Sequence, residues 1–349
     1  MLNAGRGNPN WIATEPRDAF FLLGQFAMKE ARRVRDDVIL AGMPPKKGCA
    51  DRLRKFLSKN KGAAGADFLA GVLEYGVKIK NFVPDEWIHE LTDSIIGDNY
   101  PVPPRSLVHL EQVVHDYLIK EMCDGRPPKG KFDLFPVEGG TAAMCYIFDS
   151  LMQNGLLKQG DTIALFLPTF TPYIEIAHLE RFQFKIVAIN ASSVRADGTH
   201  DWHYPATEIA KLENPKIKLA VTVNPSNPPS VAFSPVEMKQ IVGLIRKNPD
   251  LVLVTDDVYG TFVPNFRSLM AEVPHNTICV YSFSKNFGCT GWRLGVIATH
   301  EKNTMDRRIA ELPASWKQRL NKRYGAMTME PEKLKFIDRM VADLSLIHI

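Results

Sequence analysis

The sequence predicts an α/β protein in which a mainly parallel sheet is covered by helices on both faces. Two observations lead to this prediction: short apolar runs recur along most of the chain after residue 98, and segments with helical periodicity separate them. Apolar strands that alternate with helices are typical of such sheets. With 349 residues, 45% of them hydrophobic and 23% charged, the chain can bury a large core.

The first part of the chain is expected to be an arm followed by helices. Residues 1–10 are rich in Gly and Asn, which indicates a loop or arm, and 16–38 has apolar residues at helical spacing. Residues 44–62 are basic and rich in turn-forming types. Further helices are expected at about 64–80 and 85–97.

The pattern of the chain changes at about residue 98. Helices are expected at 107–122, 141–157 and 234–247, with others in the remaining gaps. The expected strands are, in order, 132–137, 162–167, 184–189, 217–223, 251–255, 277–283 and 294–299. Ligands of such sheets bind at the carboxyl ends of the strands, so the turns just after strands are the places to look for a site.

Composition argues against several classes of partner. The formal net charge is +4, but Lys and Arg are spread along the chain, without the dense stripe of a nucleic-acid surface. Five cysteines without a C-x-x-C pair indicate reduced thiols in a cytoplasm rather than disulfides or a metal site. No apolar run reaches the length of a membrane span, and the N-terminus does not show the charged-then-apolar pattern of a signal peptide. A soluble, cytoplasmic protein is expected.

Three post-strand turns could serve a ligand, although each has an ordinary explanation. In 137–143 two glycines let the backbone approach a ligand, and the helix that follows offers its N-terminus to a phosphate; a tight strand-to-helix turn explains it equally well. In 224–230 an asparagine held between prolines is rigid and can donate a hydrogen bond to a fixed acceptor; on its own, such a segment is more often an ordinary loop. In 255–259 an aspartate could pair with a cation, and the interaction energy of ~4 kcal/mol at contact would keep a pyridine nitrogen protonated. An aspartate that stabilises a turn or caps a helix explains this segment equally well.

The run 281–295 is the most specific feature of the sequence. Lys285 lies just past an apolar strand, with Ser282 and Ser284 before it and Arg293 eight residues after it. A lysine in a partly enclosed, cation-lined site can lose its proton and attack a carbonyl. The serines and the arginine would bind a dianionic phosphate. A solvated lysine is the usual expectation, and this surrounding pattern argues against it.

The segment S-x-S-K-x-x-G-x-x-G-W-R-x-G at 282–295 resembles the lysine motif of fold-type I pyridoxal-phosphate enzymes, the aspartate aminotransferase superfamily. The order Gly-Gly-Thr, Asn-Pro, Asp-x-x-Tyr, Ser-x-x-Lys and Arg is similar to that superfamily throughout. The resemblance implies that fold, a seven-stranded type of sheet between helices, and pyridoxal 5'-phosphate as the cofactor. Longer strings, NAGRGNPN, NYPVPPR, VEGGTAAM, PTFTPYIEI, VNPSNPPS, TDDVYGTF and YSFSK, resemble its aspartate 4-decarboxylase branch.

The resemblance implies a role for each matching position. Lys285 would form the Schiff base and, once the substrate has displaced it, act as the general base. The other assigned positions are Asp256 beside the ring nitrogen; Tyr259 and Asn227 on the phenolic oxygen; Phe170 stacked on the ring; Gly139, Gly140, Thr141, Ser282, Ser284 and Arg293 on the phosphate; and Tyr100 on the phosphate of a neighbouring subunit. Lys285, Asp256 and Tyr259 are the expected catalytic residues, and a homodimer or higher homo-oligomer with shared sites is expected.

The branch implies conversion of L-aspartate to L-alanine and CO2, with transamination to a 2-oxo acid as a side activity. Arg6 and Gly7 in the arm are the candidate substrate-binding residues, with Arg6 contacting a substrate carboxylate; a surface arginine in a mobile arm explains Arg6 equally well. Two alternatives stay open: a plain aminotransferase on another amino acid, and a cofactor-binding fragment without catalysis.

The resemblance also implies a division of the chain. Residues 1–97 would form the arm and the helical part of a small domain, which would be incomplete, and 98–343 the cofactor-binding large domain, also incomplete. Residues 344–349 do not resemble the family's continuation. Chains of the family are longer and carry, in the further part, the arginine that clamps the substrate's α-carboxylate, so weak or no turnover is expected from 1–349 alone.

Overall fold

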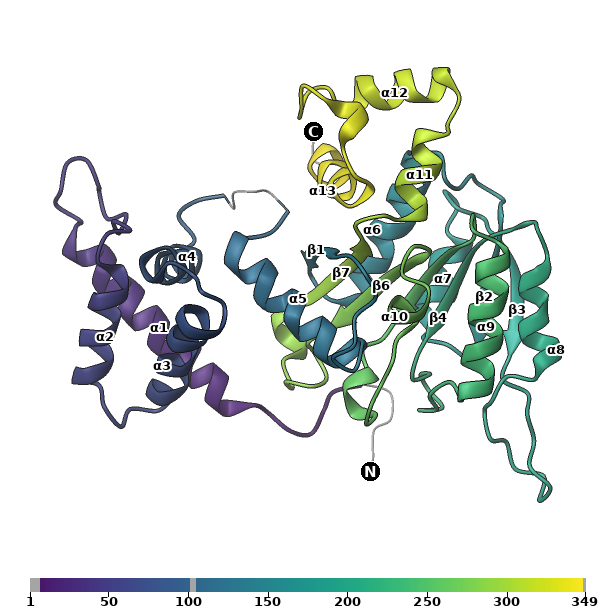
Figure 1. Cartoon of the computed structure of the whole chain (residues 1–349), viewed down its shortest axis with the longest axis horizontal. Helices are drawn as coiled ribbons and strands as arrows, with labels where there is room; N and C mark the ends of the chain where they lie inside the picture. Colours follow the sequence, from purple (N-terminus) through teal and green to yellow (C-terminus); the bar gives the residue numbers. More distant parts are fainter. Residues whose placement is uncertain (1–6, 101–104, 348–349) are drawn as a thin grey trace. The chain divides into compact units, whose positions relative to one another are not determined.

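The computed structural model describes residues 7–100 and 105–347, and its contacts divide the chain into two compact units (Figure 1). The helical unit is Pro9–Val113, and the sheet unit begins at Val114 and includes Gly7 and Asn8 from the arm. This division by contacts falls at a different place from the expected boundary after residue 97. The assignment of 1–97 to a small domain stays a prediction.

The helical unit buries one apolar cluster between its helices. Its elements are α1 (Thr14–Arg33), α2 (Cys49–Lys59), α3 (Ala66–Glu74), a π-helical turn η1 (Tyr75–Ile79), α4 (Pro84–Ile96) and the start of α5 (Val108–Met122). Helix α2 was not expected, because it lies in the basic stretch. Its apolar residues Cys49, Ala50, Leu53 and Phe56 nevertheless form one buried face, while its lysines project into solvent.

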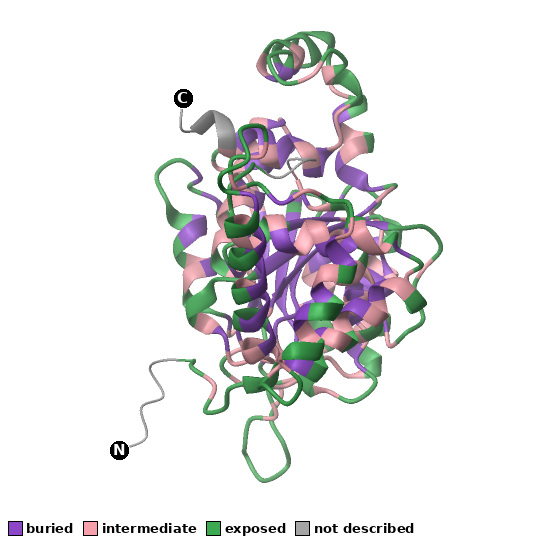
Figure 2. Ribbon diagram, turned by 90° about the vertical axis from the view of Figure 1, so that its left-hand side faces the viewer, coloured by how far each residue is buried: buried purple, intermediate pink, exposed green. Residues whose placement is uncertain are grey.

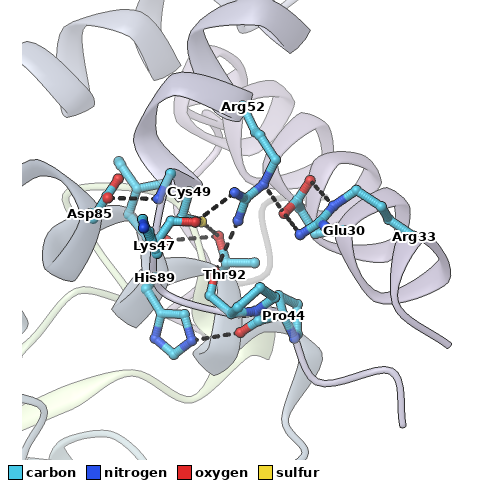
Figure 3. A network of polar contacts seen from close by, with 12 residues as sticks. Glu30, Arg33, Pro44, Lys47, Cys49, Arg52, Asp85, His89 and Thr92 are labelled. Carbon is cyan, nitrogen blue, oxygen red and sulfur yellow. Dashed lines mark hydrogen bonds and ion pairs between the residues drawn. The ribbon is translucent and has the colours of Figure 1, made fainter. Parts of the chain in front are cut away.

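A network of charged groups joins the helices of this unit (Figure 3). Glu30 in α1 is only 3% exposed and accepts hydrogen bonds from Arg33 at 3.0 Å and from Arg52 Nε at 2.5 Å. Arg52 also donates to the carbonyls of Lys47 and Pro45, and Asp85 accepts from the first N–H groups of α2. The network connects the loop before α2 to helices α1, α2 and α4.

The sheet unit contains a seven-stranded sheet in the order β1-β7-β6-β5-β4-β2-β3. Strand β7 is antiparallel to both of its neighbours, and the other pairs are parallel. The strands lie within one residue or so of the expected positions. They are β1 (Phe132–Val137), β2 (Thr162–Leu167), β3 (Lys185–Asn190), β4 (Ile217–Val223), β5 (Val252–Asp256), β6 (Thr277–Ser282) and β7 (Gly295–His300).

Helices cover both faces of this sheet, so the predicted α/β class with a mainly parallel sheet is confirmed. One face packs against α6 (Gly140–Gln153), α7 (Thr171–His178) and α13 (Phe336–Ile347). The opposite face packs against α9 (Pro235–Lys247), α10 (Leu269–Glu272) and the end of α5. Figure 2 shows the strands as a buried layer beneath these helices.

The remaining short elements lie between these strands and helices or follow the sheet. They are α8 (Ala206–Ile209), η2 (Ala210–Glu213), η3 (Gly260–Phe262), η4 (Thr290–Trp292), α11 (Thr304–Ala310), α12 (Ala314–Tyr324) and η5 (Pro331–Lys333). Helix α13 continues to Ile347, so the backbone of 344–347 is helical; whether these residues depart from the family stays a prediction. Within 7–100 and 105–347 no helix is long and apolar enough to cross a membrane.

Candidate active site

The four turns singled out in the sequence meet at one edge of the sheet. The carboxyl ends of β1, β2, β4, β5 and β6 point to this edge, because β7 alone runs the other way. Gly295, the first residue of β7, therefore pairs with the last residues of both neighbours, Val137 and Ser282. This register brings the turn after β1 and the lysine-bearing turn after β6 side by side.

Gly139 and Arg293 form a seat for an anion at the start of α6. Gly139 has φ +91°, and a Cβ placed on it would lie 2.5 Å from Arg293 Nη2. Only glycine leaves room for the guanidinium here. The N–H groups at the start of α6, from Gly140 and the exposed Thr141 onward, lack partners within the helix. The helix dipole and the arginine together favour a dianion.

Two buried serines lie beside this seat. Ser282 Oγ is 2.9 Å from Ser284 Oγ and 3.2 Å from the carbonyl oxygen of Leu294, and the Ser284 N–H donates to Ser282 Oγ at 3.3 Å. A Cβ placed on Gly140 would lie 4.0 Å from Ser282 Cβ. The structure therefore brings both serines to the same place as the glycines and Arg293, with hydroxyls that can turn toward an anion.

Asp256 ends β5 and is 6% exposed. Its carboxylate accepts hydrogen bonds from the hydroxyl of Tyr173 and from the N–H of Val258 at 3.1 Å. Burial raises the pKa of Asp256, while these hydrogen bonds and the positive charge of Lys285 act in the opposite direction. A cation placed against this carboxylate would further favour its ionised form.

Tyr173 was not singled out from the sequence. It lies in α7, one helical turn after Phe170, and is 1% exposed. Burial and the adjacent Asp256 carboxylate raise the pKa of Tyr173, so the phenol stays a neutral donor. The i, i+3 spacing from Phe170 was the available signal, since it places both rings on one side of the helix.

Lys285 lies near Asp256, and its ammonium donates a hydrogen bond to the carbonyl of Gly7. Burial lowers the pKa of Lys285; the Asp256 carboxylate opposes this shift and the Arg293 guanidinium adds to it. Mutual attraction favours the charged form of both Lys285 and Asp256, but burial outweighs that attraction at each group. The amine therefore loses its proton more easily than an exposed lysine.

The other predicted residues surround this pair. A Cβ placed on Gly7 would lie 3.9 Å from Tyr259 Oη, and burial raises the pKa of Tyr259, with Asp256 adding to the shift. Phe170 packs edge-to-face on Tyr173 with ring centroids 5.5 Å apart. Asn227 is half-buried in the turn after β4, and that turn is joined to Asp256 by the Asn224 N–H, which donates to the Asp256 carbonyl at 2.9 Å.

Two predicted residues are not part of this arrangement. Arg6 lies outside the described residues, so its predicted contact with substrate stays a prediction. Tyr100 belongs to the helical unit, where it is exposed, and its predicted role toward a second subunit also stays a prediction.

The described residues fit pyridoxal phosphate. A glycine cradle beside a helix N-terminus, an arginine and two serines suit the phosphate. The buried carboxylate of Asp256, which lacks an ion pair at contact distance among the described residues, suits the ring nitrogen, and the amine of Lys285, whose pKa is lowered, suits the aldehyde. The chemistry of these groups matches each polar part of the cofactor.

Comparison with known proteins agrees with this fit. Residues 137–332, more than half of the chain, match the model of "Aminotransferase class I and II". The chain therefore belongs to the class I and II aminotransferase family, a family of enzymes that use pyridoxal phosphate. The predicted fold type and cofactor are confirmed.

Among individual relatives, the chain is 46% identical over 346 residues to a "Bifunctional aspartate aminotransferase and L-aspartate beta-decarboxylase" of Pseudomonas sp.. The match covers 98% of this chain and 64% of the relative. An aspartate aminotransferase of Sulfurisphaera tokodaii is 27% identical over 46% of this chain and 39% of its own length. A solved aspartate aminotransferase of Rhizobium meliloti has a TM-score of 0.49 at 18% identity, covering 73% of this chain and 58% of the other.

Proposed function

We propose that this protein converts L-aspartate to L-alanine and CO2, with transamination of aspartate to a 2-oxo acid such as 2-oxoglutarate as a side activity. The observation that supports it most is the arrangement of Lys285 and Asp256 beside the glycine and arginine seat. The substrate is inferred from the Pseudomonas relative, which is named for both activities. Because the chain spans 64% of that relative, the activity and the substrate are proposals for the whole protein.

The residues of the site would divide the work as follows. Arg293, Ser282, Ser284 and the start of α6 would hold the phosphate and fix the position of the ring. Asp256, held by the Tyr173 hydroxyl, would keep a proton on the ring nitrogen. Pyridoxal phosphate, when bound, supplies a sink for the electrons left by the departing proton or CO2.

Lys285 would be the proton carrier of the reaction. Its lowered pKa favours the neutral amine, which can take the substrate's α-proton at Nζ and return it. Tyr259, kept neutral by burial, would donate a hydrogen bond from Oη to the ring's phenolic oxygen, and Asn227 would do the same from its amide. Phe170 would cover one face of the ring.

The arm would act on the substrate. The carbonyl of Gly7 meets Lys285 Nζ, so the described end of the arm reaches the reacting amine. Arg6, one residue earlier, would then be close enough to bind a substrate carboxylate as a fork. This contact would distinguish aspartate from amino acids without a second carboxylate.

We also propose that the protein works as a homodimer or higher homo-oligomer in the cytoplasm. Tyr100 is 94% exposed in its own chain, as a residue that serves a neighbouring subunit's phosphate would be. The five cysteines are free thiols, which suits a reducing compartment.

The test is to incubate the purified protein with pyridoxal phosphate and L-aspartate, with and without 2-oxoglutarate. Alanine and CO2 without an amino acceptor are expected from the whole protein, and oxaloacetate when 2-oxoglutarate is present; weak or no turnover from residues 1–349 alone stays a prediction. Borohydride reduction followed by peptide mapping should attach the cofactor to Lys285, whatever the rate of turnover.

Lys285→Ala is the control, and it should show no attachment and about 10²–10⁴-fold less turnover. Products that form only when a 2-oxo acid is present would instead indicate a plain aminotransferase. A protein that stays colourless with the cofactor and is not trapped at Lys285 would contradict the proposal as a whole.

A further inference from the structure

A second aspartate directly follows Asp256 and lies on the opposite face of the sheet. Asp257 is 0% exposed. The Asp256 side chain meets Tyr173 in α7, whereas the Asp257 side chain meets β6 and the start of α10. The two consecutive carboxyl groups therefore belong to different environments, and only Asp256 faces the candidate cofactor site.

Three donors from three elements hold the Asp257 carboxylate. Thr255 Oγ1, in β5 itself, donates at 2.6 Å; Ser268, the N-cap of α10, donates through its hydroxyl; and Cys279 Sγ, in β6, donates at 3.4 Å. Ser268 is itself fixed, because its Oγ accepts from the Met270 N–H at 3.0 Å. A carboxylate with this set of partners has one orientation.

The backbone N–H and carbonyl of Asp257 are hydrogen-bonded as well. The Asp257 N–H donates to the Val280 carbonyl at 2.9 Å, which extends the β5–β6 pairing past the end of β5. The Asp257 carbonyl accepts from the Gly260 N–H at 2.8 Å, at the turn that presents Tyr259. Asp257 thus fixes the peptide that it shares with Asp256 and the start of the turn to Tyr259.

This arrangement costs stability, which indicates a role other than folding. Burying a carboxyl group away from water is unfavourable even when it is hydrogen-bonded, and apolar side chains of similar size are usually better tolerated. The cluster around it, with Met270, Phe266 and Cys279, is otherwise apolar. A group of this kind is typical of residues that hold a functional neighbour in place.

We propose that Asp257 is a positioning residue that aims the Asp256 carboxylate at the cofactor's ring nitrogen. The inference rests on the proposed function, since it assigns Asp256 to that nitrogen. Asp257 does not touch the cofactor; it acts through the shared peptide and through the bonds to Thr255, Ser268 and Cys279.

The test compares Asp257→Ala, Asp257→Asn and Asp256→Ala in the purified protein. The measurements are the dissociation constant for pyridoxal phosphate, by fluorescence quenching, and the pH dependence of the absorbance of the lysine-bound cofactor. Asp257→Ala should weaken binding by about tenfold or more, as partners that orient a bound group usually do, and should shift the absorbance titration. Asp257→Asn keeps the shape and an acceptor oxygen, and should stay within about threefold of wild type.

Asp306→Ala is the matched control, because this carboxylate caps the backbone N–H of Phe336 and bonds Asn303 at the opposite edge of the sheet. It should lower the melting temperature without changing cofactor binding or the absorbance titration. If Asp257→Ala does not fold, Ser268→Ala and Asp257→Asn take its place, with Ser268→Ala expected to weaken binding.

The outcomes separate this inference from the proposed function. Wild-type protein that takes up no cofactor would overturn both. Weak binding by Asp256→Ala together with normal binding by Asp257→Ala, or by Ser268→Ala in its place, would overturn this inference alone. If Asp257→Asn lost as much cofactor affinity as Asp257→Ala, the charge of Asp257 and not its position would matter, and this inference would fail. If Asp306→Ala lost as much cofactor affinity, the effect would come from lower stability, and the inference would fail as well.

Discussion

The two units of the molecule treat buried charge in opposite ways. In the helical unit, Glu30 has two guanidinium partners, Arg33 and Arg52. In the sheet unit, Asp256 accepts hydrogen bonds from the Tyr173 hydroxyl and the Val258 N–H. The nearby Lys285 ammonium donates to the backbone carbonyl of Gly7 and not to this carboxylate. The charge of Glu30 is therefore neutralised by two arginines of its own unit, whereas the hydrogen-bond donors of Asp256 are neutral groups that leave its charge uncompensated.

The degree of pairing distinguishes a buried charge that serves a site from one that serves the fold. A buried charge that is fully paired is most simply a structural element, because removing it leaves its partners without compensation. A buried charge that is only partly neutralised costs stability, and a ligand can repay that cost by binding. Variants at four positions test this contrast.

The largest effect is expected at Asp256. Asp256→Ala removes the carboxylate that would hold the ring nitrogen protonated, and the lost interaction is at most ~4 kcal/mol at contact, about a thousandfold in turnover. Single-turnover kinetics with aspartate measure this effect, and the melting temperature should fall little because burial without a cation is unfavourable. Turnover within about tenfold of wild type would show that the unmet charge is not used.

A smaller effect, on stability and not on turnover, is expected at Glu30. Glu30→Gln leaves Arg33 and Arg52 without an anion in a half-buried place, so the free energy of unfolding should fall by about 3 kcal/mol. Urea denaturation measures this change. Asp51→Asn, in the exposed pair with Arg54, is the control and should cost less than about 1 kcal/mol. If Glu30→Gln weakened cofactor binding without loss of stability, the distinction between the units would fail.

The next effect tests the anion seat. Gly139→Ala places a methyl group 2.5 Å from Arg293 Nη2 and imposes φ +91° on a residue with a Cβ, a strain of about 2 kcal/mol. Affinity for pyridoxal phosphate, measured by equilibrium titration, should fall by about thirtyfold. Gly243→Ala, in open space on α9, should leave the affinity as it is. Equal affinity in both variants would contradict the seat.

The sequence predicts the sheet well and the site in part, for physical reasons. The strands are continuous apolar runs because both faces are buried, so their positions follow from local composition. Helix α2 was missed because Lys55 and Lys59 mask a short apolar face. The lysine motif is local, so Lys285, Ser282 and Ser284 were found together. Tyr173 was missed because its hydrogen bond to Asp256 joins residues 83 positions apart; the i, i+3 spacing from Phe170 indicates a neighbour of that ring but does not report this bond.

At Asp257 the expected effect is spread over several pH units, and titration can separate this aspartate from Asp256. Burial raises the pKa of Asp257 to about 7, against an ordinary value of 3.8 in the unfolded chain. Between these two values the folded state holds a proton that the unfolded state has lost, so the cost of burying this group is smallest at low pH and grows as the pH rises toward 7.

The unfolding free energy of wild type minus that of Asp257→Asn should therefore fall by at most about 1.4 kcal/mol per pH unit between about pH 4 and 7, and level off above. Urea unfolding at a series of pH values measures the difference, and the subtraction removes the contribution of the other carboxyl groups. A difference that rises with pH would mean that Thr255, Ser268 and Cys279 keep Asp257 ionised, as the arginines do for Glu30, and that it belongs with the fully paired charges.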